Sequence, residues 1–233
     1  MADITTVVEA FGTARTNAAA IAANTQFTGA YEQAAGAVNV AGGVAVVRCG
    51  TAFSNGLLTG NIYTWNGTGF YFKPTPAPKG GAATEMSTFM SIVDGSSTDG
   101  SILCGWDINT SPATPTLLAT LYTVDDDYTD PTSLGTINYN STTHAWLGWY
   151  YDATNLHWVY SSNGTTWNTH RSEPKPAFLA QADLRFSFST NRVAGSNTNA
   201  NLDNVNINGT APGGGGGGGS TNKGAGFMLL LDT

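Results

Sequence analysis

Apolar and polar positions alternate in short runs along most of this chain, and turns rich in Gly, Asn, Asp and Ser separate the runs. The clearest run is LRFSFS at 184–189, whose period of two marks a half-buried strand. Further strands are predicted at 38–47 (a hairpin about Gly42-Gly43), 84–93, 101–108, 116–124, 136–139 and 201–208. About a dozen short strands at this spacing predict an all-β sandwich.

Three other segments are interpreted from their turn and helix signals. Residues 60–73, GNIYTWNGTGFYFK, are predicted to form a strand pair about Asn66-Gly67. Residues 3–24 contain an Ala-rich run that allows one short helix, without an evident capping residue. The proline-rich segments 74–81 and 173–176 are predicted to be loops, because proline cannot donate a hydrogen bond to a sheet.

The aromatic segment 144–167 holds four of the six tryptophans. It predicts strands at 145–151 and 156–161, joined by the polar turn 152–155 and followed by a turn at 161–164. Flat rings pack against the C–H faces of sugars, so one face of this hairpin is a candidate sugar-binding or protein-binding face; its residues are Trp149, Tyr151, Trp158 and Tyr160. Both faces carry rings and only one can be core, so burial by a neighbouring loop or subunit stays open.

The order of these elements resembles the concanavalin A-like (laminin-G-like) sandwiches. The resemblance rests on the order of a strand that begins with Trp, a short polar turn, an aromatic strand that ends in Ser-Ser, and then Asn-Gly and Trp. In addition, VNVAGGVAVV and LDNVNI resemble the opening and closing strands of that family. The resemblance covers residues 5–209 and implies an antiparallel jelly roll. This superfamily includes lectins, sugar-binding modules, glycoside hydrolases and phage appendage proteins, so the fold alone does not decide function.

The composition changes after residue 208, which predicts a sandwich domain at 1–210 and a tail at 211–233. Seven glycines at 213–219 are typical of a flexible linker. The linker leads to an apolar end that is predicted to anchor the chain on another subunit, with folding back onto its own sandwich as the alternative. The anchor residues are Phe227, Met228, Leu229, Leu230 and Leu231.

Candidate catalytic acids do not stand out in the sequence. Glycoside hydrolases of the superfamily that the chain resembles usually place acids two residues apart on one strand, as in ExDxxE. The four glutamates, Glu9, Glu32, Glu85 and Glu173, have no second acid at that spacing in a predicted strand, and no GxSxG motif is present. The sequence therefore predicts a protein that is not an enzyme.

The net charge limits the classes of partner that the chain can bind, and the cysteines and acidic residues bear on disulfide and metal binding. A net charge of −7, with nine scattered basic residues, argues against binding to nucleic acid or to anionic membranes. Cys49 and Cys104 are expected to be buried free thiols, although a disulfide stays open. No cofactor is expected; Asp125, Asp127 and Asp130 are weak Ca²⁺ candidates in what is otherwise a solvated acidic turn.

These observations combine into one functional expectation. The chain shows no signal peptide, its Lys-poor composition is of an extracellular type, and it ends in a glycine-linked apolar tail. The expected protein is a non-enzymatic structural virion protein of a bacteriophage, a capsid decoration, fibre or tail appendage subunit. It would be made in the host cytoplasm, displayed on the virion surface, and held among other virion subunits, in a homo-oligomer, by its tail. The alternative is a carbohydrate-binding adhesin that recognises host glycans.

Overall fold

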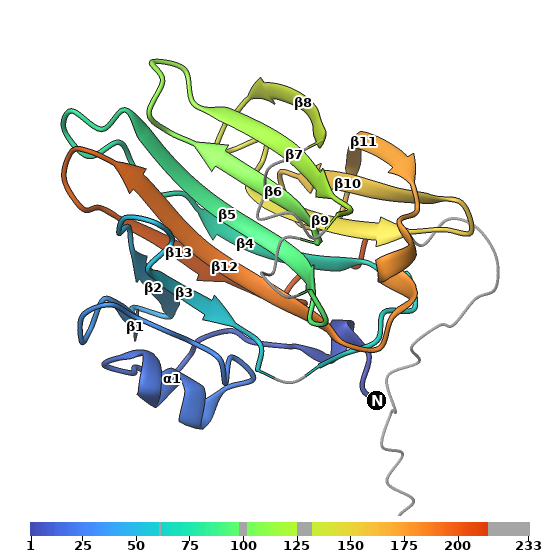
Figure 1. The fold of residues 1–233 in the computed structure, drawn as a ribbon, viewed down its shortest axis with the longest axis horizontal. Coiled ribbons are helices and arrows are strands. Elements are labelled where there is room, and N and C mark those ends of the chain that lie inside the picture. The colour runs from blue at the N-terminus through green and yellow to red at the C-terminus, as the bar shows by residue number, and fades with distance from the viewer. Residues whose placement is uncertain (61, 98–101, 125–131, 214–233) are drawn as a thin grey trace, which may run out of the picture.

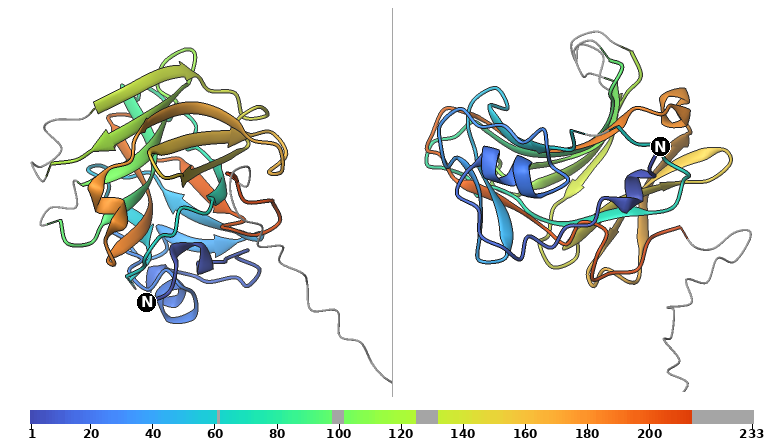
Figure 2. Two further views of the ribbon diagram at one scale, coloured as in Figure 1. Left: turned by 90° about the vertical axis from the view of Figure 1, so that its right-hand side faces the viewer. Right: turned by 90° about the horizontal axis from the view of Figure 1, so that it is seen from below.

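The computed structural model describes residues 1–60, 62–97, 102–124 and 132–213. Two antiparallel sheets lie one over the other as curved layers, as Figures 1 and 2 show. The predicted all-β jelly-roll sandwich is therefore confirmed. Among the described residues, no helix has the length and apolar character needed to cross a membrane.

Each sheet combines strands from distant parts of the chain. The seven-stranded sheet has the order β1 (Val38–Ala41), β2 (Val44–Arg48), β13 (Asn199–Asp203), β4 (Phe70–Thr75), β9 (Trp146–Tyr151), β10 (Asn155–Ser161) and β11 (Asn168–Pro174). The six-stranded sheet has the order β3 (Asn55–Leu58), β12 (Leu184–Val193), β5 (Glu85–Asp94), β6 (Leu103–Asn109), β7 (Thr116–Tyr122) and β8 (Thr132–Asn138). Short 3-10 helices lie at Ile4–Thr6 and Ala177–Ala180.

The hydrophobic core fills the space between the two sheets. Alternate residues of β12 show how the sequence builds it: Phe186 and Phe188 are fully buried, whereas Ser187 points to the opposite face. Large fully buried rings from both sheets meet here; they include Trp106, Trp149, Trp158, Phe70, Phe72, Phe186 and Phe188. Because the core occupies one face of the six-stranded sheet, the other face is free to form a site.

The prediction for residues 60–73 was wrong, and strands β3 and β11 were not predicted. The segment 60–73 is not a strand pair: Tyr63 bridges Leu184 of the six-stranded sheet, and Thr64 bridges Asp3 near the N-terminus. The segment therefore crosses between layers, and β4 begins only at Phe70. Strand β11 was not predicted, because its sequence NTHRSEP has no apolar alternation and forms an exposed sheet edge.

The short helix α1 (Ala18–Asn24) lies within the Ala-rich segment expected to allow one. The side chain of Asn17 accepts a hydrogen bond from the backbone amide of Ala20 at 2.8 Å, so the helix does have an N-cap. Its buried residues are Ala18 and Ile21, and it packs beside β1 at one end of the sandwich (Figure 1).

Candidate functional site

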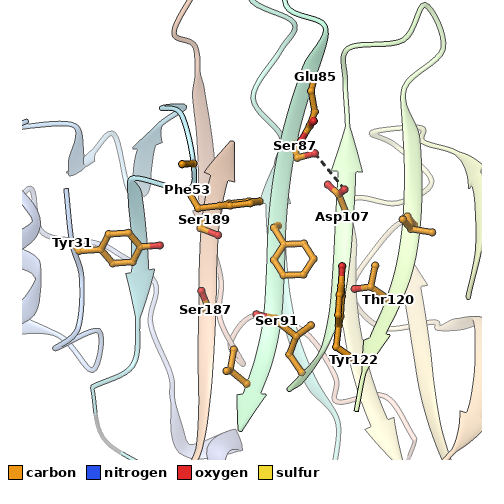
Figure 3. Close-up of a pocket in the computed structure, with 15 residues that line it drawn as sticks. Tyr31, Phe53, Glu85, Ser87, Ser91, Asp107, Thr120, Tyr122, Ser187 and Ser189 are labelled. Carbon is orange, nitrogen blue, oxygen red and sulfur yellow. Dashed lines mark hydrogen bonds between the residues drawn. The ribbon is translucent and has the colours of Figure 1, made fainter. Parts of the chain in front are cut away.

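A cavity of about 660 Å³ opens on the face of the six-stranded sheet that points away from the core. This volume lies within the range of typical ligand sites. Strands β5, β6, β7 and β12 supply most of the lining, and two loops add Tyr31, Ala52 and Phe53 (Figure 3). The sheet therefore carries a built concave site on its outer face.

The register of the strands arranges the lining residues in rows across the sheet. One row consists of Ser189, Phe89, Asp107 and Leu118; the next consists of Ser187, Ser91, Gly105 and Thr120; the third consists of Val93, Leu103 and Tyr122. A row of small residues thus lies between two rows that contain larger side chains. A Cβ atom on Gly105 would approach the Phe89 ring to 2.9 Å, so the glycine makes room for this ring.

Asp107, on β6, is one of the two acids that line the cavity. Its Oδ2 accepts a hydrogen bond from the hydroxyl of Ser87 at 3.3 Å, while its Oδ1 is buried with no partner among the described residues. The pKa of Asp107 is raised to about 7, chiefly by burial and to a smaller extent by the nearby charge of Glu85, against the opposing effect of the Ser87 hydrogen bond. Asp107 is therefore divided between its protonated and ionised forms near neutral pH.

Glu85 supplies a second carboxylate at the same end of the cavity. Figure 3 shows Glu85, Ser87 and Asp107 gathered there, on β5 and β6. Glu85 Oε1 accepts a hydrogen bond from the side-chain amide of Asn191 at 2.9 Å. The two acids thus have different surroundings, one desolvated and the other held by an amide, which is how proteins assign acid and base roles to paired carboxyl groups.

The cavity floor offers a further free oxygen. The hydroxyl of Thr120, on β7, is buried and has no hydrogen-bond partner among the described residues. Buried polar atoms are rarely left without a partner, so this hydroxyl and Asp107 Oδ1 are candidates to bind polar groups of a ligand. Sequence reasoning missed Asp107 because its neighbour Glu85 lies on another strand. The available signal was a lone acid within the mostly apolar strand LCGWDIN.

The predicted ring face of the aromatic hairpin proves to be a core face. Trp149 and Trp158 are fully buried, and Trp158 donates its indole N–H to the carbonyl of Gly105 at 2.8 Å. The half-buried Tyr151 donates its hydroxyl to the carbonyl of Trp65, and Tyr160 packs on His144. The expectation of an open sugar or protein face is therefore corrected for Trp149 and Trp158, which lie in the core between the sheets, whereas Tyr151 and Tyr160 are half-buried.

The other predicted site residues are placed as follows. Cys49 and Cys104 are buried free thiols, as expected. The anchor residues Phe227–Leu231 and the Ca²⁺ candidates Asp125, Asp127 and Asp130 lie outside the described residues. Within the described part of the chain, no group of three or more His, Cys, Asp and Glu side chains is arranged to hold a metal ion.

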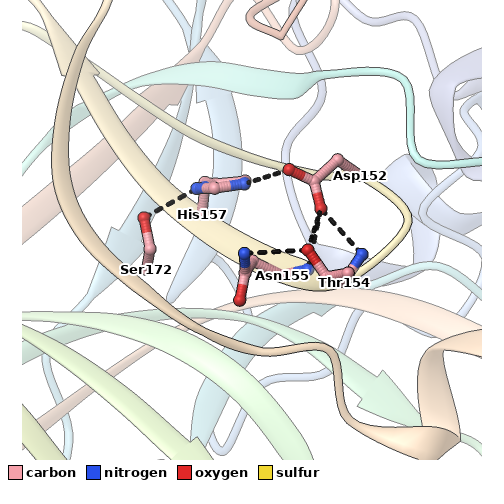
Figure 4. A network of polar contacts seen from close by, with 5 residues as sticks. All are labelled: Asp152, Thr154, Asn155, His157 and Ser172. Carbon is pink, nitrogen blue, oxygen red and sulfur yellow. Dashed lines mark hydrogen bonds and ion pairs between the residues drawn. The ribbon is translucent and has the colours of Figure 1, made fainter.

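A Ser-His-Asp network lies in the seven-stranded sheet (Figure 4). His157 Nδ1 is 2.7 Å from the hydroxyl of Ser172, and its Nε2 is 3.1 Å from Asp152 Oδ2. The other oxygen of Asp152 accepts hydrogen bonds from the backbone amides of Thr154 and Asn155, both at 2.8 Å. These bonds lower the pKa of Asp152, and the network ties the β9–β10 turn to β11. None of its residues lines the described cavity, and we assign it a structural role.

Comparison with known proteins gives matches at the level of structure. No protein-family model and no curated protein sequence matches the chain. A non-specific endo-β-1,3(4)-glucanase of family GH16, co-crystallised with a glucan oligosaccharide, superposes with a TM-score of 0.57 at 10% identity, over 85% of this chain and 91% of that one. The catalytic domain of an endo-1,3-β-glucanase (laminarinase) from Thermotoga petrophila gives a TM-score of 0.54 at 8% identity, over 84% of this chain and 93% of that one. At such identities the likeness establishes the fold, which is the concanavalin A-like jelly roll.

These matches correct two functional expectations. The chain was expected to be a non-enzymatic virion protein, but the two solved structures described above are glucanases, and neither points to a bacteriophage. The rejection of enzymatic function rested on acids two residues apart in a single strand. In the structure Asp107 and Glu85 lie on adjacent strands and line the same end of one cavity, as Figure 3 shows.

Proposed function

We propose that this protein is a glycoside hydrolase that binds a β-glucan across the cavity of the six-stranded sheet. The observation that carries this proposal is the pair of carboxyl groups at one end of the cavity, with the pKa of Asp107 raised to about 7. Glycoside hydrolysis needs one carboxyl group that donates a proton and a second that is ionised. The glucanase structures of the same fold support the choice of a β-glucan.

Asp107 is the residue suited to act as the general acid. In its protonated form it donates its proton to the glycosidic oxygen as the bond to the anomeric carbon breaks, so that the departing sugar leaves as an alcohol. As that bond breaks, Glu85 acts as the second carboxylate in one of two ways. It attacks the anomeric carbon and forms a glycosyl ester, which water then hydrolyses with the ionised Asp107 as the base, or it takes a proton from the water molecule that attacks that carbon directly. The anomeric form of the first product, followed by NMR, distinguishes these two roles.

A glycan-binding protein without hydrolytic activity is the second candidate. The observation in its favour is that β5 and β6 each present one acid to the cavity, in place of the single-strand acid motif of the superfamily's hydrolases. In that case Asp107 Oδ1 and the Thr120 hydroxyl would bind sugar hydroxyl groups without any bond being broken.

The test is the release of reducing ends from laminarin and from a mixed-linkage β-glucan. We expect hydrolysis by the wild-type chain, and a loss of at least about a hundredfold in Asp107→Asn and Glu85→Gln. Asp152→Asn, outside the cavity, is the matched control and should retain activity. Binding of both glucans with no release of reducing ends would support the second candidate, and neither binding nor release would refute both.

A further inference from the structure

The loop between β2 and β3 carries a ring in an unusual backbone setting. Phe53 is 40% exposed, and its φ angle is 50°, next to a φ angle of 52° at Ala52. Two successive residues with side chains in this left-handed region carry strain, which persists only where surrounding contacts enforce it. Backbone strain that exposes a phenyl ring to solvent does not stabilise the folded chain. The ring therefore points to a role in binding a ligand.

The exposed ring belongs to the cavity. Figure 3 shows Phe53 extending from its loop towards β5, above Ser189. Its centroid lies 6.1 Å from that of Phe89, with the two ring planes inclined at 60°. Phe89 is the direct cross-strand partner of Asp107. An aromatic wall therefore stands next to the acid that we propose to donate the proton.

One side chain fixes both the loop and the second acid. Asn191, on β12, accepts a hydrogen bond from the backbone amide of Ala52 at 2.8 Å and donates one to Glu85 Oε1 at 2.9 Å. The backbone amide of Arg192 also donates to the carbonyl of Gly50 at 3.0 Å, which holds the loop to the same strand. A displacement of Asn191 would thus move the ring-bearing loop and the carboxylate together.

We propose that Phe53 is the platform on which a sugar ring of the β-glucan stacks. Asn191 is then a positioning residue that fixes the position of this platform relative to Glu85. The inference rests on the proposed function and names a specificity determinant for it. The flat apolar face of a β-linked glucose unit matches a phenyl ring, whereas the row of Ser187 and Ser91 beneath it offers hydroxyl groups to the polar edge of the sugar.

The platform is tested by matched substitutions of Phe53, with kcat and KM measured on laminarin and mixed-linkage β-glucan. Phe53→Leu keeps apolar volume but removes the flat face, so we expect KM to rise by about three- to tenfold with kcat nearly unchanged. Phe53→Tyr should stay within about twofold of the wild type, because it keeps the aromatic face. Val8→Ala, at a side chain 46% exposed outside the cavity lining, is the control.

Asn191 is tested by separating its two hydrogen bonds. Asn191→Asp keeps the acceptor for Ala52 but replaces the donor to Glu85 with a carboxylate that repels it, so kcat should fall by about tenfold with KM close to that of the wild type. Asn191→Ala loses both bonds, so kcat should fall and KM should rise together. Equal effects of the two variants on both constants would refute the positioning role.

The outcomes distinguish this inference from the proposed function. A Phe53→Leu variant with wild-type KM, in a chain that does hydrolyse β-glucan, would refute the platform and leave the proposed function intact. A wild-type chain that neither binds nor hydrolyses either glucan would refute the proposed function and the platform with it. A lower melting temperature in Phe53→Leu with unchanged KM would show that the ring only packs on Phe89.

Discussion

The hydroxyl of Ser87 on β5 donates a hydrogen bond to Asp107 on β6 across 3.3 Å, and this bond opposes the burial of the acid. A hydrogen bond to a carboxylate favours its ionised form, whereas desolvation favours the protonated form. In Asp107 desolvation prevails, which raises its pKa to about 7. The balance between these two residues sets the pH at which the cavity holds a protonated acid.

Removal of the Ser87 hydroxyl should move this balance. In Ser87→Ala the ionised form of Asp107 loses its hydrogen bond, so the pKa of Asp107 should rise by up to about one pH unit. Because a general acid works only while protonated, activity on β-glucan should decline above about pH 7 in the wild type, and at a higher pH in Ser87→Ala. A pH profile of kcat/KM measures the shift. Superimposable basic limbs would contradict the assignment of Asp107 as the general acid.

The same pKa shift makes a prediction about stability. The native state holds a proton on Asp107 up to about pH 7, whereas the unfolded chain releases it near pH 4. The native state thus binds more protons in this window, and the free energy of unfolding should fall as pH rises from 4 to 7, by up to about 4 kcal/mol. Asp107→Asn should lack this fall and be the more stable chain at pH 8. Urea unfolding at a series of pH values tests it, and parallel curves for both chains would refute it.

The sequence predicted the strands in which apolar and polar residues alternate, as in a half-buried sheet. It did not predict the strands that lack this alternation. Strand β12 was predicted because Phe186 and Phe188 alternate with serines. Strand β11 was not, since its pairing with β10 is secured by backbone hydrogen bonds at an exposed edge. Nor could the sequence tell which ring-bearing face of the hairpin is core. That choice depends on where the second sheet lies.

The site was harder to predict than the fold because it depends on register. Asp107 lies opposite Phe89 on the adjacent strand, and it lines the cavity close enough to Glu85 for the charge of Glu85 to act on it. A search along the chain for two acids on one strand cannot find a pair assembled from two strands. The platform residue Phe53 was equally hidden, because it lies in a loop and owes its position to the side chain of Asn191, far along the chain.

The network around Asp152 predicts an acid-sensitive contribution to stability. Its hydrogen bonds with the Thr154 and Asn155 amides and with His157 hold the pKa of Asp152 below the ordinary range. A group whose pKa is depressed by folding contributes stability above its unfolded pKa, near 4, and loses it as pH falls below that value. Asp152→Asn retains a side-chain acceptor for the turn but cannot ionise. Its melting temperature should decline less than that of the wild type between pH 4 and pH 2, and an equal decline would refute the prediction.

Because the backbone of the loop between β2 and β3 is strained, we expect one substitution there to stabilise the chain. Ala52 has a φ angle of 52°, and glycine adopts this region without the steric cost that a Cβ atom brings. Ala52→Gly should therefore raise the free energy of unfolding by about 0.5–1 kcal/mol, net of the larger entropy of glycine in the unfolded chain. Chemical denaturation measures the change. A loss of stability would mean that the contacts of the Ala52 methyl group outweigh the strain.

Substitution of Gly105, at the cavity floor, is predicted to destabilise the chain. A Cβ atom at this position would lie 2.8 Å from the hydroxyl oxygen of Thr120, 2.9 Å from Phe89 Cζ and 3.0 Å from the carbonyl oxygen of Met90. The backbone carbonyl cannot rotate away from the sheet, so Gly105→Ala should destabilise the chain by about 1–3 kcal/mol and displace the Phe89 ring. Gly12→Ala is the matched control, because a Cβ atom there meets nothing within 4 Å. If the two variants unfolded at the same denaturant concentration, β5, β6 and β7 could not be packed so closely around Gly105. A selective loss in Gly105→Ala, accompanied by weaker glucan binding, would tie the position of Phe89 to the cavity that it lines.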